Sequence, residues 1–327
     1  MFAACSKTIG KIDFFMGIVM KINYGMVCVV LLSSHVMFAR LEVLDNTLSK
    51  VKLLSTEEMR FCYISFVKIN GTKYIIKQKK SNFIRKIVGV VRDSITAHVA
   101  ENFGSGLGLD ADLAHRVDVI SAGEKFPGKR RKDWPATIHT IAPGKMVKAQ
   151  DTRYNSMNIK QADIGFRRDM LVWMAKHELL IMMVALDTFL CNHDRHRGNL
   201  FYTPSTDSFC AIDMDSAFKY NLCALACENF TKMINNRKLA LSSKEIQVLT
   251  TYRKHLQFLI DNNHSEDTLS MYNYFAEKAG FVEGSDLYTE RVAEELESNR
   301  AMIIQSYEDA KQLVKIVEQL IAKHTKA

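Results

Sequence analysis

The sequence has no uninterrupted apolar segment long enough to span a bilayer, which takes about 20 residues. Its longest N-terminal run, residues 26–32, is bounded by polar residues on both sides. Lys7, Lys11 and Lys21 before this run and Ala39 after it resemble a secretory signal only weakly. We therefore expect residues 1–40 to be a packed or poorly ordered extension, or a segment upstream of the true start site.

Cysteine spacing also excludes the common sequence patterns of a metal or disulfide framework. The chain has seven cysteines, an odd number, without any Cys-x-x-Cys and without zinc-like spacing to histidine. Reduced thiols in a reducing, cytoplasmic compartment are the simplest interpretation.

Nucleic-acid motifs, internal repeats and low-complexity tracts are absent as well. The net charge of +8 is mild for 327 residues, and basic residues cluster only at 125–132. That cluster could contact phosphates or an acidic membrane, but a solvated loop is the favoured interpretation. At this length, with 47% hydrophobic residues, the chain can form one large domain or two lobes.

Charged residues concentrate directly after an apolar run. Residues 179–190 predict a buried helix, since they are apolar and lack Gly and Pro. Asp194 and Asn199 follow, and after a short β-like segment (200–202 and 208–212) come Asp213 and Asp215. A plain helix C-terminus with basic residues and Gly198 would explain part of this pattern. It would leave Asn199 and the two later aspartates unexplained.

Asp194-Arg195-His196-Arg197-Gly198-Asn199 resembles the Asp-Arg-His-x-x-Asn loop of the protein-kinase-like superfamily. The similarity is to its atypical branch, which includes phosphoinositide 3- and 4-kinases and HipA-type kinases. The resemblance implies an α+β, bilobed fold that uses ATP and Mg²⁺. It also implies that Asp194 is catalytic, that Asn199 and Asp213 hold the metal, and that His196 is either catalytic or structural. Asp215 stands where the family has glycine. It would be either a second metal contact or a surface charge, and the surface charge is slightly favoured.

The N-terminal half predicts a β-rich lobe. Residues 61–69 and 73–78 predict strands joined by a turn at Asn70-Gly71. By the resemblance, Lys77 is the phosphate-binding lysine, with Lys73 on the same strand face as its competitor. The apolar spacing in residues 92–103 predicts a helix, and within it Glu101 is our candidate for the acidic partner of Lys77. We expect Asp93 to stabilise the helix dipole instead.

Further strands are predicted at 117–121 and 136–142, before a break at Pro143-Gly144 that suits a hinge between lobes. By the resemblance, backbone groups at 139–142 would meet the adenine. From residue 164 the chain predicts helices, including one that a capping box at Ser242 opens. We expect three parts: the extension 1–40, a kinase-like N-lobe 41–145 and a helical C-lobe 146–327.

One departure from the family pattern is the lack of glycine between Gly25 and Gly71, so a glycine-rich phosphate loop is missing. We expect residues 53–59, with Ser55 and Thr56, to cover the nucleotide. The missing loop favours a pseudokinase, a binding module without catalysis, while intact Asp194, Asn199 and Asp213 favour an enzyme. A helical scaffold without a nucleotide site is a third alternative.

The acceptor is argued from the segment after Asp213. In residues 215–230, Lys219 is the only basic residue, so this segment offers little positive charge for a lipid head group. A protein hydroxyl is therefore favoured over a phosphoinositide, and we expect no nucleic-acid partner. Transfer of AMP or glutamate, known for the same fold, is not distinguished by these residues.

Overall fold

The computed structural model describes residues 51–80, 87–107, 114–147 and 168–325. The predicted extension 1–40 lies outside these residues. Lys52–Ala327 forms one compact unit. Among the described helices, none has the length and apolar character that a membrane span requires.

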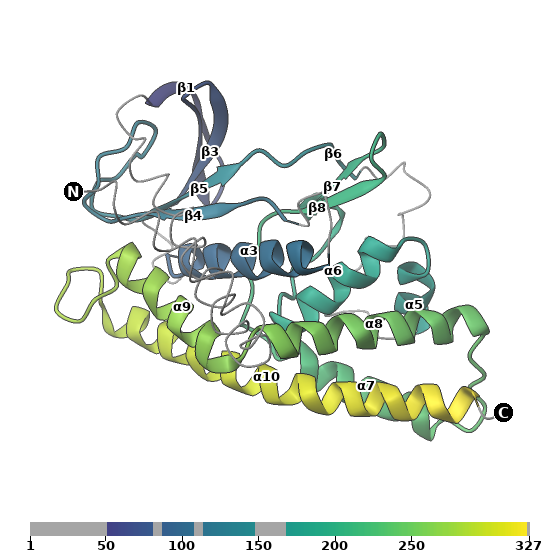
Figure 1. Cartoon of the computed structure of the whole chain (residues 1–327). Coiled ribbons are helices and arrows are strands. Elements are labelled where there is room, and N and C mark those ends of the chain that lie inside the picture. The colour runs from purple at the N-terminus through teal and green to yellow at the C-terminus, as the bar shows by residue number, and fades with distance from the viewer. Residues whose placement is uncertain (1–50, 81–86, 108–113, 148–167, 326–327) are drawn as a thin grey trace, which may run out of the picture. The chain divides into compact units, whose positions relative to one another are not determined.

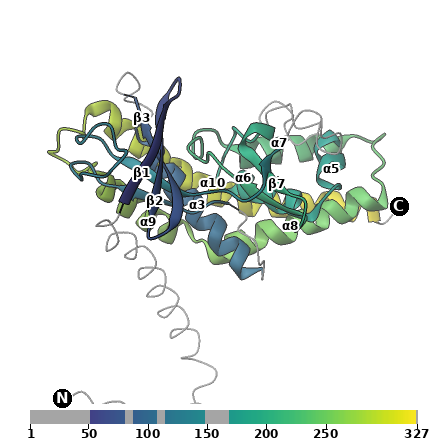
Figure 2. The same cartoon turned by 90° about the horizontal axis from the view of Figure 1, so that it is seen from above.

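The N-terminal part is built on an antiparallel sheet with strand order β1-β2-β3-β5-β4 (Figure 1). Its strands are β1 (Val51–Glu58), β2 (Cys62–Ile69), β3 (Thr72–Lys79), β4 (Val117–Ile120) and β5 (Ala136–Thr140). Figure 2 shows β1, β2 and β3 side by side. The predicted hairpin is confirmed: Asn70 and Gly71 both have positive φ, of 48° and 90°, which fits a two-residue type I′ turn.

Helix α3 (Gly89–Gly106) packs against β4 and β5 and against α9. It is longer than the predicted 92–103 by three residues at each end. The helix is also buried beyond the expected single apolar stripe, since the charged residues Arg92 and Asp93 are buried as well. Arg92 is satisfied by Glu295 at 2.6 Å and by the carbonyl oxygen of Asp215 at 2.7 Å.

A second sheet has three strands, one before and two after the loop that carries Asp194 and Asn199. It contains β6 (Lys145–Met146), β7 (Leu200–Thr203) and β8 (Ser208–Ala211), in that order. Helix α6 (Glu178–Phe189) matches the predicted buried helix, and a separate shorter helix, α5 (Arg168–Met174), precedes it.

The rest of the C-terminal part is helical: α7 (Leu222–Asn235), α8 (Ser243–Asn262), α9 (Ser265–Ala279) and α10 (Glu290–Thr325). The long α10, yellow in Figure 1, contacts α7, α8 and α9. The predicted capping box is present, with Ser242 and Glu245 bonded reciprocally at the start of α8. The predicted α+β fold, with a β-rich N-terminal part and a mostly helical C-terminal part, is confirmed.

Candidate active site

A cavity of about 540 Å³ lies where β3, the end of β5, the loop of Asp194 and the loop of Asp213 meet. This is a typical size for a small-molecule site. Lys77, Asp194 and Asp213, which are far apart in the sequence, all line it. So do His139, Thr140, Ile141 and Ala142, the residues expected to meet an adenine.

Lys77 forms ion pairs with Asp213 and, at 3.4 Å, with Asp215. Burial alone would lower the pKa of Lys77, but the carboxylates of Asp215 and Asp213 outweigh it and raise that pKa well above its usual value. Lys77 therefore carries a firm positive charge inside the cavity. Lys73, its competitor, is exposed and lies opposite Lys68 on β2, outside the cavity lining.

Asp215 is a half-buried member of the same charge cluster. Lys79 forms an ion pair with it, in addition to Lys77. Burial would raise the pKa of Asp215, yet the two lysines hold it well below its usual value. Our preference for Asp215 as a surface charge is not supported by its 19% side-chain exposure. Lys79, two residues beyond Lys77 on the same strand face, is a cavity residue that the sequence analysis missed.

The acidic residue of α3 that acts on Lys77 is Asp93, whose charge helps to raise the pKa of Lys77. Its carboxylate accepts a hydrogen bond from the backbone N–H of Met214 at 3.1 Å, so it serves the Asp213 loop and not the start of α3. Glu101, our candidate for this role, forms an ion pair with Arg116 at 3.2 Å and is not among the cavity-lining residues.

Asp194 is held at the cavity by a buried network beneath it. Arg195, which is 1% exposed, pairs with Asp187 of α6 at 2.9 Å. Its guanidinium also donates to the carbonyl oxygens of Asn199 at 2.6 Å and Ile212 at 3.0 Å. One arginine thus joins α6, the loop that carries Asp194 and the loop that carries Asp213. In the sequence, Asp187 is the single carboxylate within a twelve-residue apolar run, and this position could have indicated a buried ion pair.

Asn199 and His196 have local roles in this loop. The Asn199 amide donates to the backbone oxygen of Asp194 at 3.1 Å, and its side chain is buried. The His196 ring accepts from the N–H of Gly198 at 3.0 Å and so caps the short 3₁₀ turn η4 (Arg197–Asn199). This contact supports the structural alternative for His196, which does not line the cavity.

Asp213 itself has φ of +56°, a left-handed conformation that is uncommon outside glycine. Aspartate adopts this conformation more readily than most residues, and such outliers concentrate at functional sites. Its side chain is 39% exposed, so the carboxylate is accessible from the cavity.

The turn between β1 and β2 contributes to the lining of the cavity. Met59, Arg60 and Phe61 line the cavity, whereas Ser55 and Thr56, which we expected there, lie within β1 and outside the lining. The Arg60 guanidinium lies 4.9 Å from the centre of the Phe61 ring. A cationic side chain, Arg60, therefore lines the cavity next to the segment 53–59 that was expected to cover the nucleotide.

The basic cluster at 125–132 is a folded loop. The Lys129 ammonium donates to the carbonyl oxygens of Ser121, Glu124 and Lys132 at 2.6, 2.9 and 3.1 Å. Three fixed carbonyl partners identify Lys129 as a residue that closes this loop, which agrees with the favoured structural interpretation.

Comparisons with known proteins give distant likenesses only. No protein-family model matches the chain, and no curated protein matches it. Among solved structures it is similar to a Helicobacter pylori proinflammatory kinase, CtkA, at 12% identity and a TM-score of 0.44, over 80% of this chain and 96% of that one. It is also similar to the aminoglycoside phosphotransferase APH(4)-Ia at 10% identity and a TM-score of 0.27, over 86% and 97% of the two chains. Function is therefore inferred from the residues of the cavity.

Proposed function

We propose that the chain is an ATP-dependent phosphotransferase that acts on a hydroxyl group, more readily of a protein than of a lipid. The observation that carries the proposal is the convergence of Lys77, Asp194 and Asp213 in one cavity, closed by the end of β5. Phosphoryl transfer needs positioning and charge stabilisation more than covalent chemistry, and these three side chains supply both.

The oxygen donors at the cavity fit Mg²⁺. Asp213 and Asp215 line the cavity and offer carboxylate oxygens, and Asn199, buried in the loop of Asp194 and outside the lining, offers an amide oxygen; these are the hard ligands that Mg²⁺ prefers. Asp213 and Asn199 would hold the ion, and Asp215 would add a contact. When bound with ATP, Mg²⁺ would neutralise charge on the phosphates.

The chain's own residues would do the remaining work. Lys77 would bind phosphate oxygens, Arg60 would cover them, and backbone groups of residues 139–142 would meet the base. Asp194, half-buried at the cavity, would orient the acceptor hydroxyl and receive its proton. The Arg195–Asp187 pair would keep Asp194 and Asp213 in register, because it bonds both loops.

A pseudokinase is the second candidate, and two observations favour it. The glycine-rich loop is missing, and Lys77 already neutralises the carboxylate that a metal would use. On this alternative, the same ion pairs would serve the fold alone. A phosphoinositide kinase is a variant of the first proposal with a different acceptor.

Asp194→Asn separates these candidates, because the amide keeps the shape of the side chain but cannot take a proton. We expect transfer from the γ-phosphate of labelled ATP to fall by about 10²–10⁴-fold, the usual effect of losing a general base. Mg²⁺-ATP binding, followed by thermal shift, should stay near the wild-type value. Acceptors to test are the chain itself, a peptide library and phosphoinositide vesicles.

The outcomes divide clearly. Equal transfer by wild type and Asp194→Asn would contradict the assigned mechanism. Mg²⁺-ATP binding by the wild type without transfer to any acceptor or to water would favour the pseudokinase. Failure to bind Mg²⁺-ATP at all would remove the nucleotide site from the proposal.

A further inference from the structure

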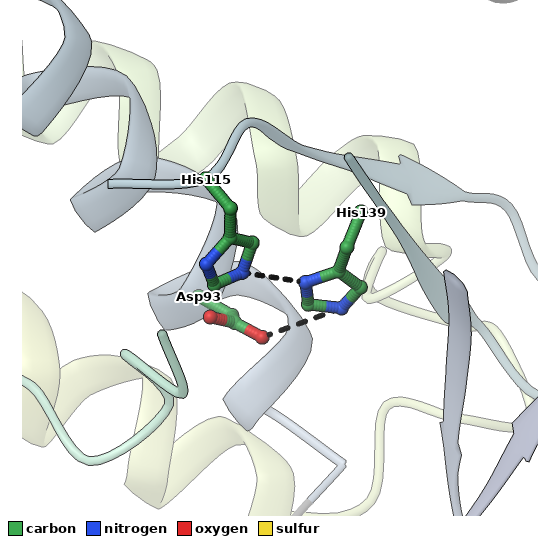
Figure 3. Close-up of side chains that lie close together, drawn as sticks. All are labelled: Asp93, His115 and His139. Carbon is green, nitrogen blue, oxygen red and sulfur yellow. Dashed lines mark hydrogen bonds and ion pairs between the residues drawn. The ribbon is translucent and has the colours of Figure 1, made fainter. Parts of the chain in front are cut away.

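Three buried side chains from separate segments converge: Asp93 of α3, His115 before β4 and His139 of β5 (Figure 3). They are 1%, 4% and 6% exposed. One ligand atom from each lies within 4.8 Å of the other two. Two imidazoles and a carboxylate at such short range form a set of metal-binding groups.

His115 is oriented as metal-binding histidines usually are. Its Nδ1 lies 2.9 Å from the carbonyl oxygen of Ala211, so Nδ1 carries the proton and the Nε2 lone pair points inward. A backbone carbonyl on the far nitrogen is a typical second shell for a ligating histidine. The inward Nε2 lies 2.8 Å from Nδ1 of His139.

His139 can present its own lone pair to the same point. Its Nε2 lies 2.7 Å from the Thr137 hydroxyl, and that hydroxyl can donate to the carbonyl oxygen of Lys77 at 3.3 Å. In the metal-free chain, Nδ1–H of His139 donates to Nε2 of His115, and the Thr137 hydroxyl donates to Nε2 of His139. With a cation bound, His139 would instead donate from Nε2 to Thr137, so that its Nδ1 and the Nε2 of His115 both present lone pairs to the ion.

The spacing and charge state of the three groups bear on this arrangement. Two ligands on a tetrahedral zinc ion lie about 3.3 Å apart. The structure has 2.8 Å between His115 Nε2 and His139 Nδ1, and 3.7 Å between Asp93 Oδ2 and the other ring nitrogen of His139, Nε2, so Asp93 and the His139 ring would have to shift for all three to bind one ion. Burial lowers the pKa of His115 to about 4 and that of His139 well below its usual value, so both are neutral near pH 7. Burial also raises the pKa of Asp93 to about 7, so an added cation there is favourable.

We propose that Asp93, His115 and His139 form a binding site for one zinc-like transition-metal ion. Mixed nitrogen and oxygen ligands suit Zn²⁺, whereas Mg²⁺ prefers the oxygen-only set at Asn199 and Asp213. The inference goes beyond the proposed phosphotransferase activity and does not depend on it. Sequence spacing gives no hint of it, because the ligands lie more than twenty residues apart in the chain.

The site would also act on the loop of Asp213. His115 binds the carbonyl of Ala211, and Asp93 accepts from the N–H of Met214. These contacts lie on either side of Asp213, so fixing the two ligands fixes both ends of that loop. Zinc should therefore slow amide hydrogen exchange in residues 211–215.

The test uses the full chain, stripped with a chelator and titrated with Zn²⁺ and Co²⁺. We expect one zinc per chain after gel filtration, measured by mass spectrometry of the metal. Bound Co²⁺ should give the intense visible bands of a four-coordinate site without a thiolate charge-transfer band. A thiolate band would place the ion on cysteine and overturn the proposal.

Variants assign the ligands. His139→Ala and His115→Ala should weaken zinc binding by at least about 100-fold, since ligand loss exceeds the 10–100-fold typical of second-shell changes. The matched control is His98→Ala, a neighbouring histidine of α3 that bonds Asn102. Asp213→Asn should also leave zinc binding unchanged, because it belongs to the other proposed site.

Three results would overturn the proposal: no stoichiometric zinc, zinc binding that survives His139→Ala, or zinc binding that Asp213→Asn abolishes. The three side chains would then be a hydrogen-bonded network only. If the histidine variants fail to fold, X-ray absorption of the zinc-loaded wild type decides. Nitrogen and oxygen neighbours support the site, and sulfur or oxygen-only neighbours refute it.

Discussion

Removing Asp187 should be among the most destabilising single changes at this site. The carboxylate is fully buried and accepts from Arg195 Nε at 2.9 Å, Arg195 Nη2 at 3.1 Å and Asn192 Nδ2 at 2.8 Å. Asp187→Ala leaves the Arg195 guanidinium, itself 1% exposed, without its counter-charge. Breaking a buried pair in this way costs about 3–5 kcal/mol, a large share of the roughly 5–15 kcal/mol that stabilises a typical protein.

The assay is unfolding by urea and by heat, followed by circular dichroism. At roughly 2 °C per kcal/mol for a chain of this size, Tm should fall by about 6–10 °C. Glu228→Ala is the control, because its i,i+4 pair with Lys232 is exposed at both ends. That change should cost about 0.5 kcal/mol or less.

A double substitution tests the cause. Asp187→Leu combined with Arg195→Met replaces the ion pair with apolar side chains, and such replacements of buried pairs are often neutral. The double variant should be more stable than Asp187→Leu or Arg195→Met alone, although it still lacks the Arg195 donors to the carbonyl oxygens of Asn199 and Ile212. A loss under about 1 kcal/mol in Asp187→Ala, or a double variant no more stable than the singles, would refute the reasoning.

Two further changes are predicted. Lys77→Met should reduce phosphoryl transfer in a steady-state assay by about 100-fold, the scale for losing one electrostatic contact to the transition state. The control, Lys73→Met at an exposed position, should keep near wild-type transfer. Equal losses in the two variants would reject Lys77 as the phosphate-binding lysine. Arg168 and the Ser242 cap lower the pKa of Glu245 to about 2 from 4.5, so its stabilisation is present above pH 4.5 and is lost as pH falls towards 2. The difference in free energy of unfolding between wild type and Glu245→Gln should shrink over that range in urea titrations, and a constant difference would contradict the assignment.

Local signals predicted most of the elements. The apolar run before Asp194, the Asn70-Gly71 turn and the Ser242 box each act through neighbours in sequence, and each has its expected structure. The convergence of Lys77 with Asp213 followed from the motif resemblance, not from periodicity. A fold that brings β3 next to the Asp213 loop is a long-range property that the local pattern does not contain.

The choice between Asp93 and Glu101 shows where the sequence was insufficient. Both are acids on α3, eight residues apart and so about 80° apart around the helix axis. An exposed helix would reveal its inward face by its apolar stripe, but α3 is buried on most sides. Which acid acts on Lys77 through its charge is then set by the packing of α3 against the sheet and the Asp213 loop, and only the structure provides that.

Charge balance in the cavity links the site's stability to its proposed chemistry. Lys77 and Lys79 match Asp213 and Asp215, so this group of four is neutral and each charge has a partner without any ligand. Buried charges that lack partners are costly, which explains why these four persist together. A cation can use Asp213 fully only if Lys77 finds another anion, and a phosphate group is such an anion. The same pairs that stabilise the empty cavity therefore favour metal and phosphate entering together over either one alone.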